Sequence, residues 1–245
     1  MSHRTEGRSR RGVILSAGAG VCLILAGCTG AAAPGGPGDG EEPGEAVEEA
    51  EEEISPAEDL MREHGLLGRV LLVYEEGVRR IEAGEDLPPD VLVQSAGIVR
   101  RFIEDYHEKL EEEFIFPRFE KAGRLAGLVS TLKAQHAAGR DVTGMIQQIG
   151  TATALRDKSS SGNLVSAIRS FVRMYRPHAA REDTVLFPAL HEIVSPQEYG
   201  ALGEAFEDRE RKLFGQDGFE SMVDVVAGIE KALGIDDLAG FTPTA

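Results

Sequence analysis

The chain has 245 residues, of which 42% are hydrophobic, and its net charge is -16. This length suits one folded core with flanking segments rather than two large domains. A strongly acidic chain lacks the clustered Lys and Arg that bind phosphate backbones, so no nucleic-acid partner is expected.

Residues 1–27 have the pattern of a secretory signal peptide, with a basic start followed by an apolar run from Val13 to Leu25. The apolar run is too short for a comfortable membrane span. Leu25-Ala26-Gly27-Cys28 resembles the lipobox of bacterial lipoproteins, which implies lipid on Cys28. We therefore predict an exported lipoprotein, membrane-anchored and facing the periplasm or the cell exterior. Arg10 and Arg11 leave export by the twin-arginine route open beside the general secretory route.

Residues 28–54 consist mainly of Gly, Pro, Ala and Glu. Such a segment buries too little apolar surface to offset the entropy of ordering, so we predict a disordered tether after the lipidated cysteine. Cys22 is removed with the signal peptide and Cys28 carries lipid, so no disulfide is expected.

Residues 55–195 are predicted to form an all-α, up-down-up-down four-helix bundle. Ser55-Pro56-Ala57-Glu58 is a capping box that opens the first helix. Apolar residues then recur at helical spacing, with a polar loop expected at 157–163 and helix distortion at Pro117 and Pro188. The predicted helices span residues 56–83, 90–122, 124–155 and 164–194.

Residues 196–245 are predicted to form a C-terminal extension with two shorter amphipathic helices, at about 196–214 and 219–233. They carry no recognisable chemistry, and we expect them to pack against the bundle.

Two stretches share the motif His-x3-Glu-x4-Phe-Pro. The first begins with His107 and Glu111, and the second with His178 and Glu182. Residues four apart on an α-helix point in nearly the same direction, so each stretch aims an imidazole and a carboxylate at one point. This is the geometry of half a metal site.

Each motif follows a single histidine, His64 or His136, at nearly the same distance in the sequence. We interpret this as a twofold internal repeat. Imidazole and carboxylate ligands at helical spacing suit Fe, Mn or Zn in a bundle core better than Mg or Ca. The predicted metal ligands are His64, His107, Glu111, His136, His178 and Glu182.

A single histidine on an apolar helix face is more often a core residue than a ligand, so the prediction depends on the joint spacing of all six residues. His191 faces away from the others and is predicted to lie on the surface. Glu108, Glu112 and Glu113 fall off the ligand face and are predicted to form a solvated acidic run.

The repeated motif resembles the hemerythrin-like, or HHE cation-binding, family over about residues 56–195. The resemblance implies a non-haem di-iron centre, with Mn or Zn as alternatives, inside the bundle. The ligands that it implies are His64 and His107 for one iron, His136 and His178 for the other, and Glu111 and Glu182 as bridging carboxylates.

Three further residues are candidates for the ligand set or its surroundings. Oxygen-carrying hemerythrins have a second His at the position of Arg140 and an Asp at that of Asp183, which leaves Glu182 or Asp183 as the second carboxylate. Arg140 is expected to pair with Glu111 or Glu182, or to lie exposed. Tyr175 is expected to donate a hydrogen bond to a ligand held by the metals, or simply to pack in the core.

The resemblance implies binding of O2, NO or peroxide, as a carrier, sensor or scavenger. The ligand set is most similar to the di-iron proteins of iron–sulfur cluster repair, although their amino-terminal cysteine-bearing segment is absent. The alternatives are a di-iron enzyme that reduces NO or peroxide or oxidises iron, and a metal-free helical interaction module. The sequence predicts neither a protein partner nor an oligomeric state.

Overall fold

The structure is a computed structural model that describes residues 54–88 and 90–243. The predicted signal peptide, Cys28 and nearly all of the predicted tether lie outside the described residues. The bundle contains α1 (Pro56–Ala83), α2 (Val91–Ile98), η1 (Val99–His107), α3 (Glu108–Leu110), η2 (Glu111–Ile115), α4 (Phe116–Ala122), α5 (Ala126–Ile149), α6 (Ala152–Leu155), α7 (Lys158–Arg181), η3 (Glu182–Leu186) and α8 (Phe187–Leu190). It is followed by α9 (Pro196–Phe214), α10 (Gly218–Leu233) and η4 (Leu238–Phe241).

α1 begins and ends where the sequence predicts. The Ser55 hydroxyl accepts a hydrogen bond from the backbone N–H of Glu58 at 3.2 Å. Pro56 stands in the first turn, where its missing N–H leaves no helical bond unmade. Gly84 ends the helix with a φ of 67°, a left-handed conformation that glycine adopts without strain. One face of α1 is buried and forms a wall of the core.

The second long helix is a composite of α2, η1, α3, η2 and α4, in which η1 and η2 are π-helical. The fourth long helix has one such segment, η3, between α7 and α8. η2 and η3 lie directly before the turns that contain Pro117 and Pro188. A proline lacks the N–H and crowds the carbonyl four residues earlier, and a wider turn relieves both problems. The two helices are therefore widened at these prolines rather than ended by them.

The predicted polar loop at 157–163 is wrong, because α7 already begins at Lys158. Asp157 accepts a hydrogen bond from the backbone N–H of Ser160 at 2.8 Å, so the polar stretch caps a helix instead of separating two. The third helix is interrupted at Gly150, after which the short α6 completes the predicted span.

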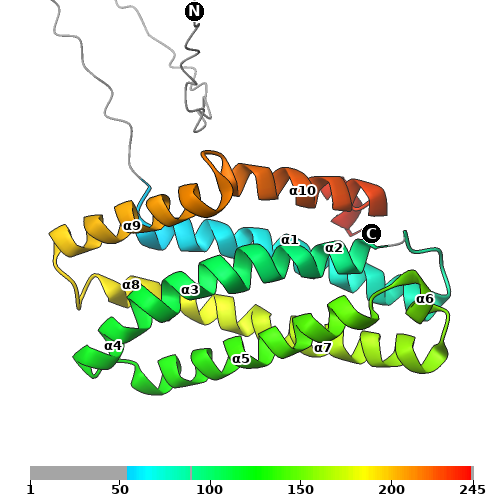
Figure 1. Cartoon of the computed structure of the whole chain (residues 1–245), viewed down its shortest axis with the longest axis horizontal. Helices are drawn as coiled ribbons and strands as arrows, with labels where there is room; N and C mark the ends of the chain where they lie inside the picture. Colours follow the sequence, from blue (N-terminus) through cyan, green and yellow to red (C-terminus); the bar gives the residue numbers. More distant parts are fainter. Residues whose placement is uncertain (1–53, 89, 244–245) are drawn as a thin grey trace, which may run out of the picture. The chain divides into compact units, whose positions relative to one another are not determined.

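The four long helices built from α1, α2 to α4, α5 and α6, and α7 to α8 lie side by side and run alternately in opposite directions (Figure 1). α1 packs against α7 and α2, and α5 packs against α7 and α2, so the four long helices enclose one core. This arrangement confirms the predicted up-down-up-down bundle. The described residues contain no β-strand.

The two predicted C-terminal helices are present and cover one side of the bundle. α9 and α10 both pack on α1, and α10 also contacts α2. Phe214 at the end of α9 contacts Phe102 and Tyr106 of η1, with ring centroids 5.4 Å apart in both pairs. The aromatic contacts join the extension to the helix that carries His107.

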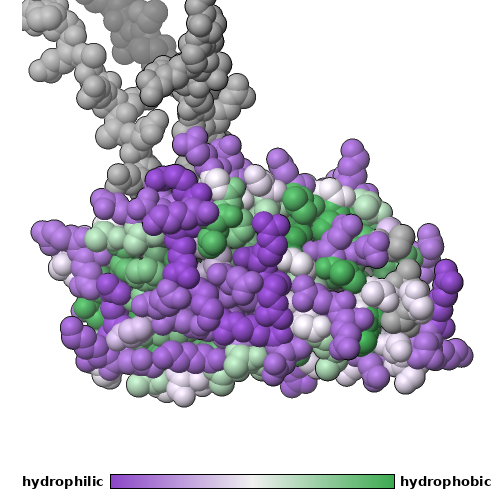
Figure 2. Space-filling view, viewed as in Figure 1, coloured by the Kyte–Doolittle hydropathy of each residue, from purple (hydrophilic) through white to green (hydrophobic). Residues whose placement is uncertain are grey.

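The visible surface of the bundle is mostly hydrophilic and has only small, separated hydrophobic areas (Figure 2). This agrees with the acidic composition. Within residues 54–88 and 90–243, no helix has both the length and the apolar character needed to cross a bilayer.

Candidate metal centre

Four histidine side chains from four different helices meet inside the bundle. His64 lies on α1, His107 at the end of η1, His136 on α5 and His178 on α7, and none is more than 6% exposed. The Nε2 atoms of His64 and His107 are 3.0 Å apart, and those of His136 and His178 are 3.2 Å apart. The fold therefore arranges the histidines in two pairs, one from each half of the sequence repeat.

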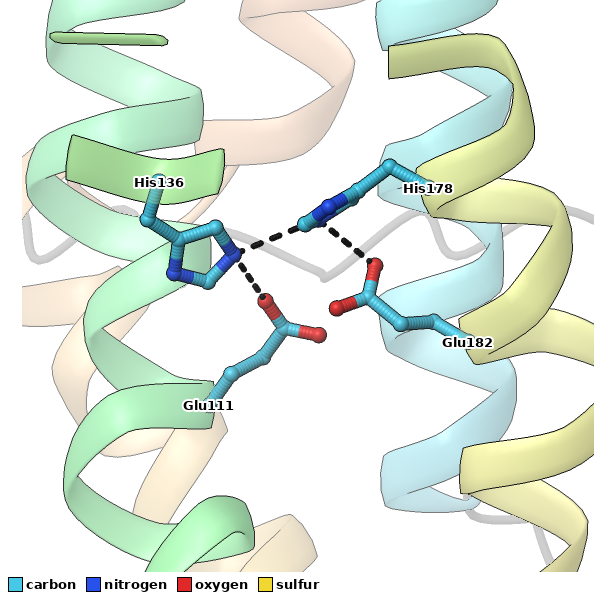
Figure 3. A group of neighbouring side chains, drawn as sticks. All are labelled: Glu111, His136, His178 and Glu182. Carbon is cyan, nitrogen blue, oxygen red and sulfur yellow. Dashed lines mark hydrogen bonds and ion pairs between the residues drawn. The ribbon is translucent and has the colours of Figure 1, made fainter. Parts of the chain in front are cut away.

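Glu111 and Glu182 lie between the two pairs, and each carboxylate approaches one histidine of each pair. Figure 3 shows Glu111, His136, His178 and Glu182 pointing toward one another from separate helical segments. The distances from the carboxylate Oε2 to Nε2 are 3.3 Å for Glu111 to His136, 3.7 Å for Glu111 to His107, 3.1 Å for Glu182 to His178 and 3.3 Å for Glu182 to His64.

The spacing of these atoms fits bound cations. Two ligand atoms about 2.1 Å from one metal and at right angles to each other are about 3 Å apart, which matches both Nε2 pairs. Within the described part of the chain, the oxygens of Glu111 and Glu182 find no hydrogen-bond partner of good geometry, although both side chains are fully buried. Buried carboxylates are strongly disfavoured without a compensating cation. These six residues could therefore hold metal, and their N and O donors suit Fe, Mn or Zn.

Each imidazole also contacts a side-chain oxygen through Nδ1, the ring nitrogen that faces away from the cluster. A carboxylate or amide oxygen that accepts from Nδ1–H leaves the lone pair of Nε2 directed at the cluster, and it makes Nε2 a stronger donor. The four Nδ1 contacts are His64 to Asp183 at 2.7 Å, His107 to Glu63 at 2.6 Å, His136 to Glu112 at 3.1 Å and His178 to Gln135 at 2.9 Å.

The structure separates the roles of Glu182 and Asp183, which the sequence left open. Glu182 is fully buried and approaches Nε2 of both His64 and His178. The Asp183 side chain is 34% exposed and contacts His64 on the opposite edge of the ring, at Nδ1. Glu182 has the position of a ligand, and Asp183 that of a residue which orients one.

Two glutamates that were predicted to be solvated are instead part of the site. Glu108 is only 1% exposed, and Glu112 contacts Nδ1 of His136. Only Glu113 lies at the surface, where it pairs with Arg209. The neighbouring helices explain the error, because the side of the helix beside the ligand face packs against Arg140 and His136 of α5 and Tyr175 of α7 instead of facing solvent.

Arg140 contacts neither of the predicted bridging carboxylates, so that expectation is wrong. Its Nη2 atom lies 2.7 Å from Oε2 of Glu108 and 2.7 Å from Oε1 of Glu112. Because Glu112 also contacts His136, Arg140 fixes the carboxylate that orients this histidine.

Tyr175 is almost completely buried, and its hydroxyl donates a hydrogen bond to Oε1 of Glu108 at 2.6 Å. The hydroxyl is therefore engaged outside the cluster centre. Gly139 on α5 makes room for this ring, since a Cβ atom at that position would lie 2.1 Å from the Tyr175 oxygen. Tyr175 packs in the core, as one of its two predicted roles required, and also holds Glu108.

The charges of the cluster favour bound protons when no cation is present. Burial alone lowers the pKa of His64, but the contacts of its ring with Asp183 and Glu182 outweigh this effect and raise the pKa to about 10. His136 behaves alike, since contacts with Glu111 and Glu112 raise its pKa to about 10 against the effect of burial. For His107 burial dominates and lowers the pKa to about 4.

The two central carboxylates shift in opposite directions. Burial and the neighbouring Glu182 raise the pKa of Glu111. Burial also acts to raise the pKa of Glu182, but the close approach of the His178 and His64 imidazoles lowers it overall. A cation that enters this cluster displaces protons, so binding is coupled to proton release.

Sequence reasoning missed Glu63 and Gln135, the residues that hold His107 and His178. Each directly precedes the single histidine of its repeat half, His64 or His136. Successive helical residues point about 100° apart, so each side chain reaches the histidine of the neighbouring helix instead of the one beside it. Their equivalent positions in the two halves of the repeat could have identified them as residues of the site.

A helical bundle with two His pairs and two shared carboxylates defines a class of metal-binding proteins. The hemerythrin HHE cation-binding domain matches residues 55–190, and the chain belongs to this family. It is also similar to uncharacterized proteins from Mycobacterium bovis and from two strains of Mycobacterium tuberculosis, with 46% identity over 230 residues in each case. The similarity covers 94% of this chain and 89% of the relatives, so it extends into the C-terminal helices. No solved structure matches the chain.

Proposed function

We propose that the chain is a non-haem di-iron protein that binds a small diatomic or reactive species, O2, NO or peroxide, as a carrier, sensor or scavenger. One observation carries this proposal: two Nε2 pairs and two buried carboxylates converge on a single cluster. Family membership supports a metal-binding role independently of this geometry.

The ligand count leaves room for a small molecule. His64 and His107 would hold one iron, His136 and His178 the other, and Glu111 and Glu182 would bridge them. Each iron would then have four protein ligands, fewer than the roughly six of an octahedral shell. When bound, the irons supply reversible redox chemistry and open coordination positions.

The phenylalanines of the two motifs restrict access to the cluster. Phe116 stacks on His136 and Phe187 stacks on His64, with ring centroids 5.5 Å and 5.6 Å apart. The Phe of each motif therefore covers a histidine of the other half of the repeat. Such apolar cover excludes bulk water and favours small, weakly hydrated ligands.

Metal content tests the proposal. The full chain loaded anaerobically with ferrous iron is expected to retain about two irons and to develop near-ultraviolet absorption on exposure to air. Glu111→Ala and His178→Ala are expected to lose most of this iron. His191→Ala is the control, because His191 is exposed and stacks on Tyr199 with ring centroids 4.0 Å apart. Equal iron content in all three variants would contradict the proposal.

An enzymatic function, reduction of NO or peroxide or oxidation of ferrous iron by the same residues, is the alternative. It is favoured by Arg140, which stands where oxygen carriers of the family have a further histidine and which binds carboxylates instead. Mixing the reduced protein with O2 distinguishes the carrier function from the enzymatic function. A carrier forms a stable adduct that releases O2 under vacuum, whereas an oxidase is oxidised irreversibly.

We also propose that the protein is exported and anchored through lipid on Cys28. The sequence pattern Leu25-Ala26-Gly27-Cys28 supports this proposal. Cys28→Ala is expected to abolish labelling with a fatty-acid analogue and to release the chain from the membrane fraction. Equal membrane association of the variant and the native chain would contradict it.

A further inference from the structure

The repeat symmetry of the site extends to the groups behind the imidazoles. Asp183, which contacts His64, directly follows Glu182, and Glu112, which contacts His136, directly follows Glu111. Both groups are carboxylates, so these two contacts are equivalent in the two halves.

The symmetry is broken at the other two contacts. Nδ1 of His107 lies 2.6 Å from a carboxylate oxygen of Glu63, whereas Nδ1 of His178 lies 2.9 Å from an amide oxygen of Gln135. These partners occupy the same place in the repeat, immediately before its single histidine. A carboxylate in one half is therefore replaced by a neutral amide of nearly the same shape in the other.

The surrounding charges strengthen this difference. Within the described residues, no Lys or Arg forms an ion pair with Glu63 or Asp183. On the other side, Glu112 pairs with both Arg140 and Lys109. In the described residues, no ion pair offsets the negative charge behind the His64 and His107 pair, whereas two cations offset the charge of Glu112 behind His136.

We propose that the irons at the two positions differ in reduction potential because a carboxylate in one half is exchanged for an amide in the other. The position held by His64 and His107 is the one that retains ferric iron, and a one-electron reductant reduces the iron at the His136 and His178 position first. The inference rests on the proposed di-iron function.

The physical reason lies in the formal charge that distinguishes a carboxylate from an amide. With a cation at Nε2 and a single proton between them, the His107 imidazole and the Glu63 carboxyl group carry one negative charge, wherever that proton resides. The His178 and Gln135 unit is neutral. Negative charge on the far side of a ligating imidazole increases donation from Nε2, and stronger donation stabilises the more highly charged metal ion. The effect is not screened, because Glu63 and His107 are both buried.

Two near-isosteric substitutions test the inference. The full chain and its variants are loaded with ⁵⁷Fe²⁺, and the two midpoint potentials are measured by a stepwise reductive titration followed by Mössbauer and electron paramagnetic resonance spectroscopy. Glu63→Gln is expected to raise the lower potential and leave the upper one in place. Gln135→Glu is expected to lower the upper potential and leave the lower one in place. Each change should reduce the stability constant of the mixed-valence state about tenfold, a change of about 59 mV for a one-electron couple.

Gln148→Glu is the matched control, since it adds the same charge to an exposed position of α5 far along the helix from Gln135. It should move neither potential. Unchanged potentials in Glu63→Gln and Gln135→Glu, with two irons still bound, would overturn this inference but not the proposed di-iron function. A larger difference between the two midpoint potentials in Glu63→Gln would contradict the assignment of the lower potential to the His64 and His107 position. A native chain that binds no iron would overturn the proposed function as well. If Glu63→Gln fails to fold, Gln135→Glu still tests the inference from the other half of the repeat.

Discussion

Nδ1 of His64 lies 2.7 Å from Oδ1 of Asp183, on the edge of the ring that faces away from the cluster. The adjacent Glu182 approaches the opposite edge of the same ring. Two neighbouring carboxylates on one helix therefore face the two nitrogens of one imidazole.

The relationship predicts different consequences for the two acidic residues. Asp183→Asn keeps an oxygen that accepts from Nδ1–H, so it should retain two irons with affinity weakened about tenfold, at the mild end of such substitutions. Glu182→Gln removes a predicted bridging ligand and should lose most of the iron. Iron per chain after dialysis against a graded series of chelator concentrations measures both effects. Greater loss in Asp183→Asn than in Glu182→Gln would reverse the two roles.

Gly139 and Gly144 give a paired test of the packing around Tyr175. Both lie inside α5, where replacing Gly by Ala ordinarily stabilises a helix by up to about 1 kcal/mol. A Cβ at Gly139 would lie 2.1 Å from the Tyr175 oxygen and 2.8 Å from its Cζ, whereas the nearest atom to a Cβ at Gly144 is Nη2 of Arg100 at 3.7 Å. Gly139→Ala should therefore destabilise the fold and Gly144→Ala should not, as measured by urea unfolding. Equal stability of the two variants would show that Tyr175 moves freely.

Arg140 is expected to stabilise the bundle more than a surface arginine does. Its guanidinium contacts Glu108 and Glu112, and Glu108 is almost fully buried. Arg140→Met leaves that buried carboxylate without its cation, which should lower the free energy of unfolding by about 2 kcal/mol. Arg169→Met is the control, since the pair of Arg169 with Glu82 is exposed and should contribute less than about 1 kcal/mol. Similar losses in both variants would contradict this role of Arg140.

The fold and the six central residues followed from the sequence because both depend on local periodicity. Helical spacing of apolar residues predicted the four long helices, and the His-x3-Glu motifs predicted which side chains share a helix face. His64 and His136 were found only through the repeat, since neither is distinctive alone. The structure brings all six together.

The surroundings of the site were not predictable in the same way. The burial of Glu108 and the contact of Glu112 with His136 depend on the packing of α5 and α7 beside this helix, which a helical wheel of one segment does not show. Glu63 and Gln135 act on histidines of neighbouring helices, so their roles depend on how the helices pack. Arg140 was expected either to pair with Glu111 or Glu182 or to lie exposed, and only the packed positions of Glu108 and Glu112 show which charges it meets.

We expect Glu104 to make the stability of the metal-free protein depend on pH. Its side chain is fully buried, and burial together with the neighbouring Glu108 raises its pKa from 4.5 to about 7, although Thr143, Arg100 and Arg140 act to lower it. A raised pKa means that the folded chain keeps a proton which the unfolded chain releases. The stability that this group contributes is thus fully present below about pH 4.5 and is lost as the pH rises through about 7.

Glu104→Gln should remove this dependence, because the amide stays neutral at every pH. One pKa unit corresponds to about 1.4 kcal/mol, so the variant should exceed the native chain in free energy of unfolding by about 1 to 3 kcal/mol at pH 8 and by little at pH 5. Urea unfolding of both proteins at the two pH values, with iron removed, measures the difference. Glu204→Gln on the exposed face of α9 is the control and should match the native chain at both pH values. An equal loss of stability in Glu104→Gln at both pH values would instead mean that the ion pair of Glu104 with Arg100 outweighs the burial of its charge.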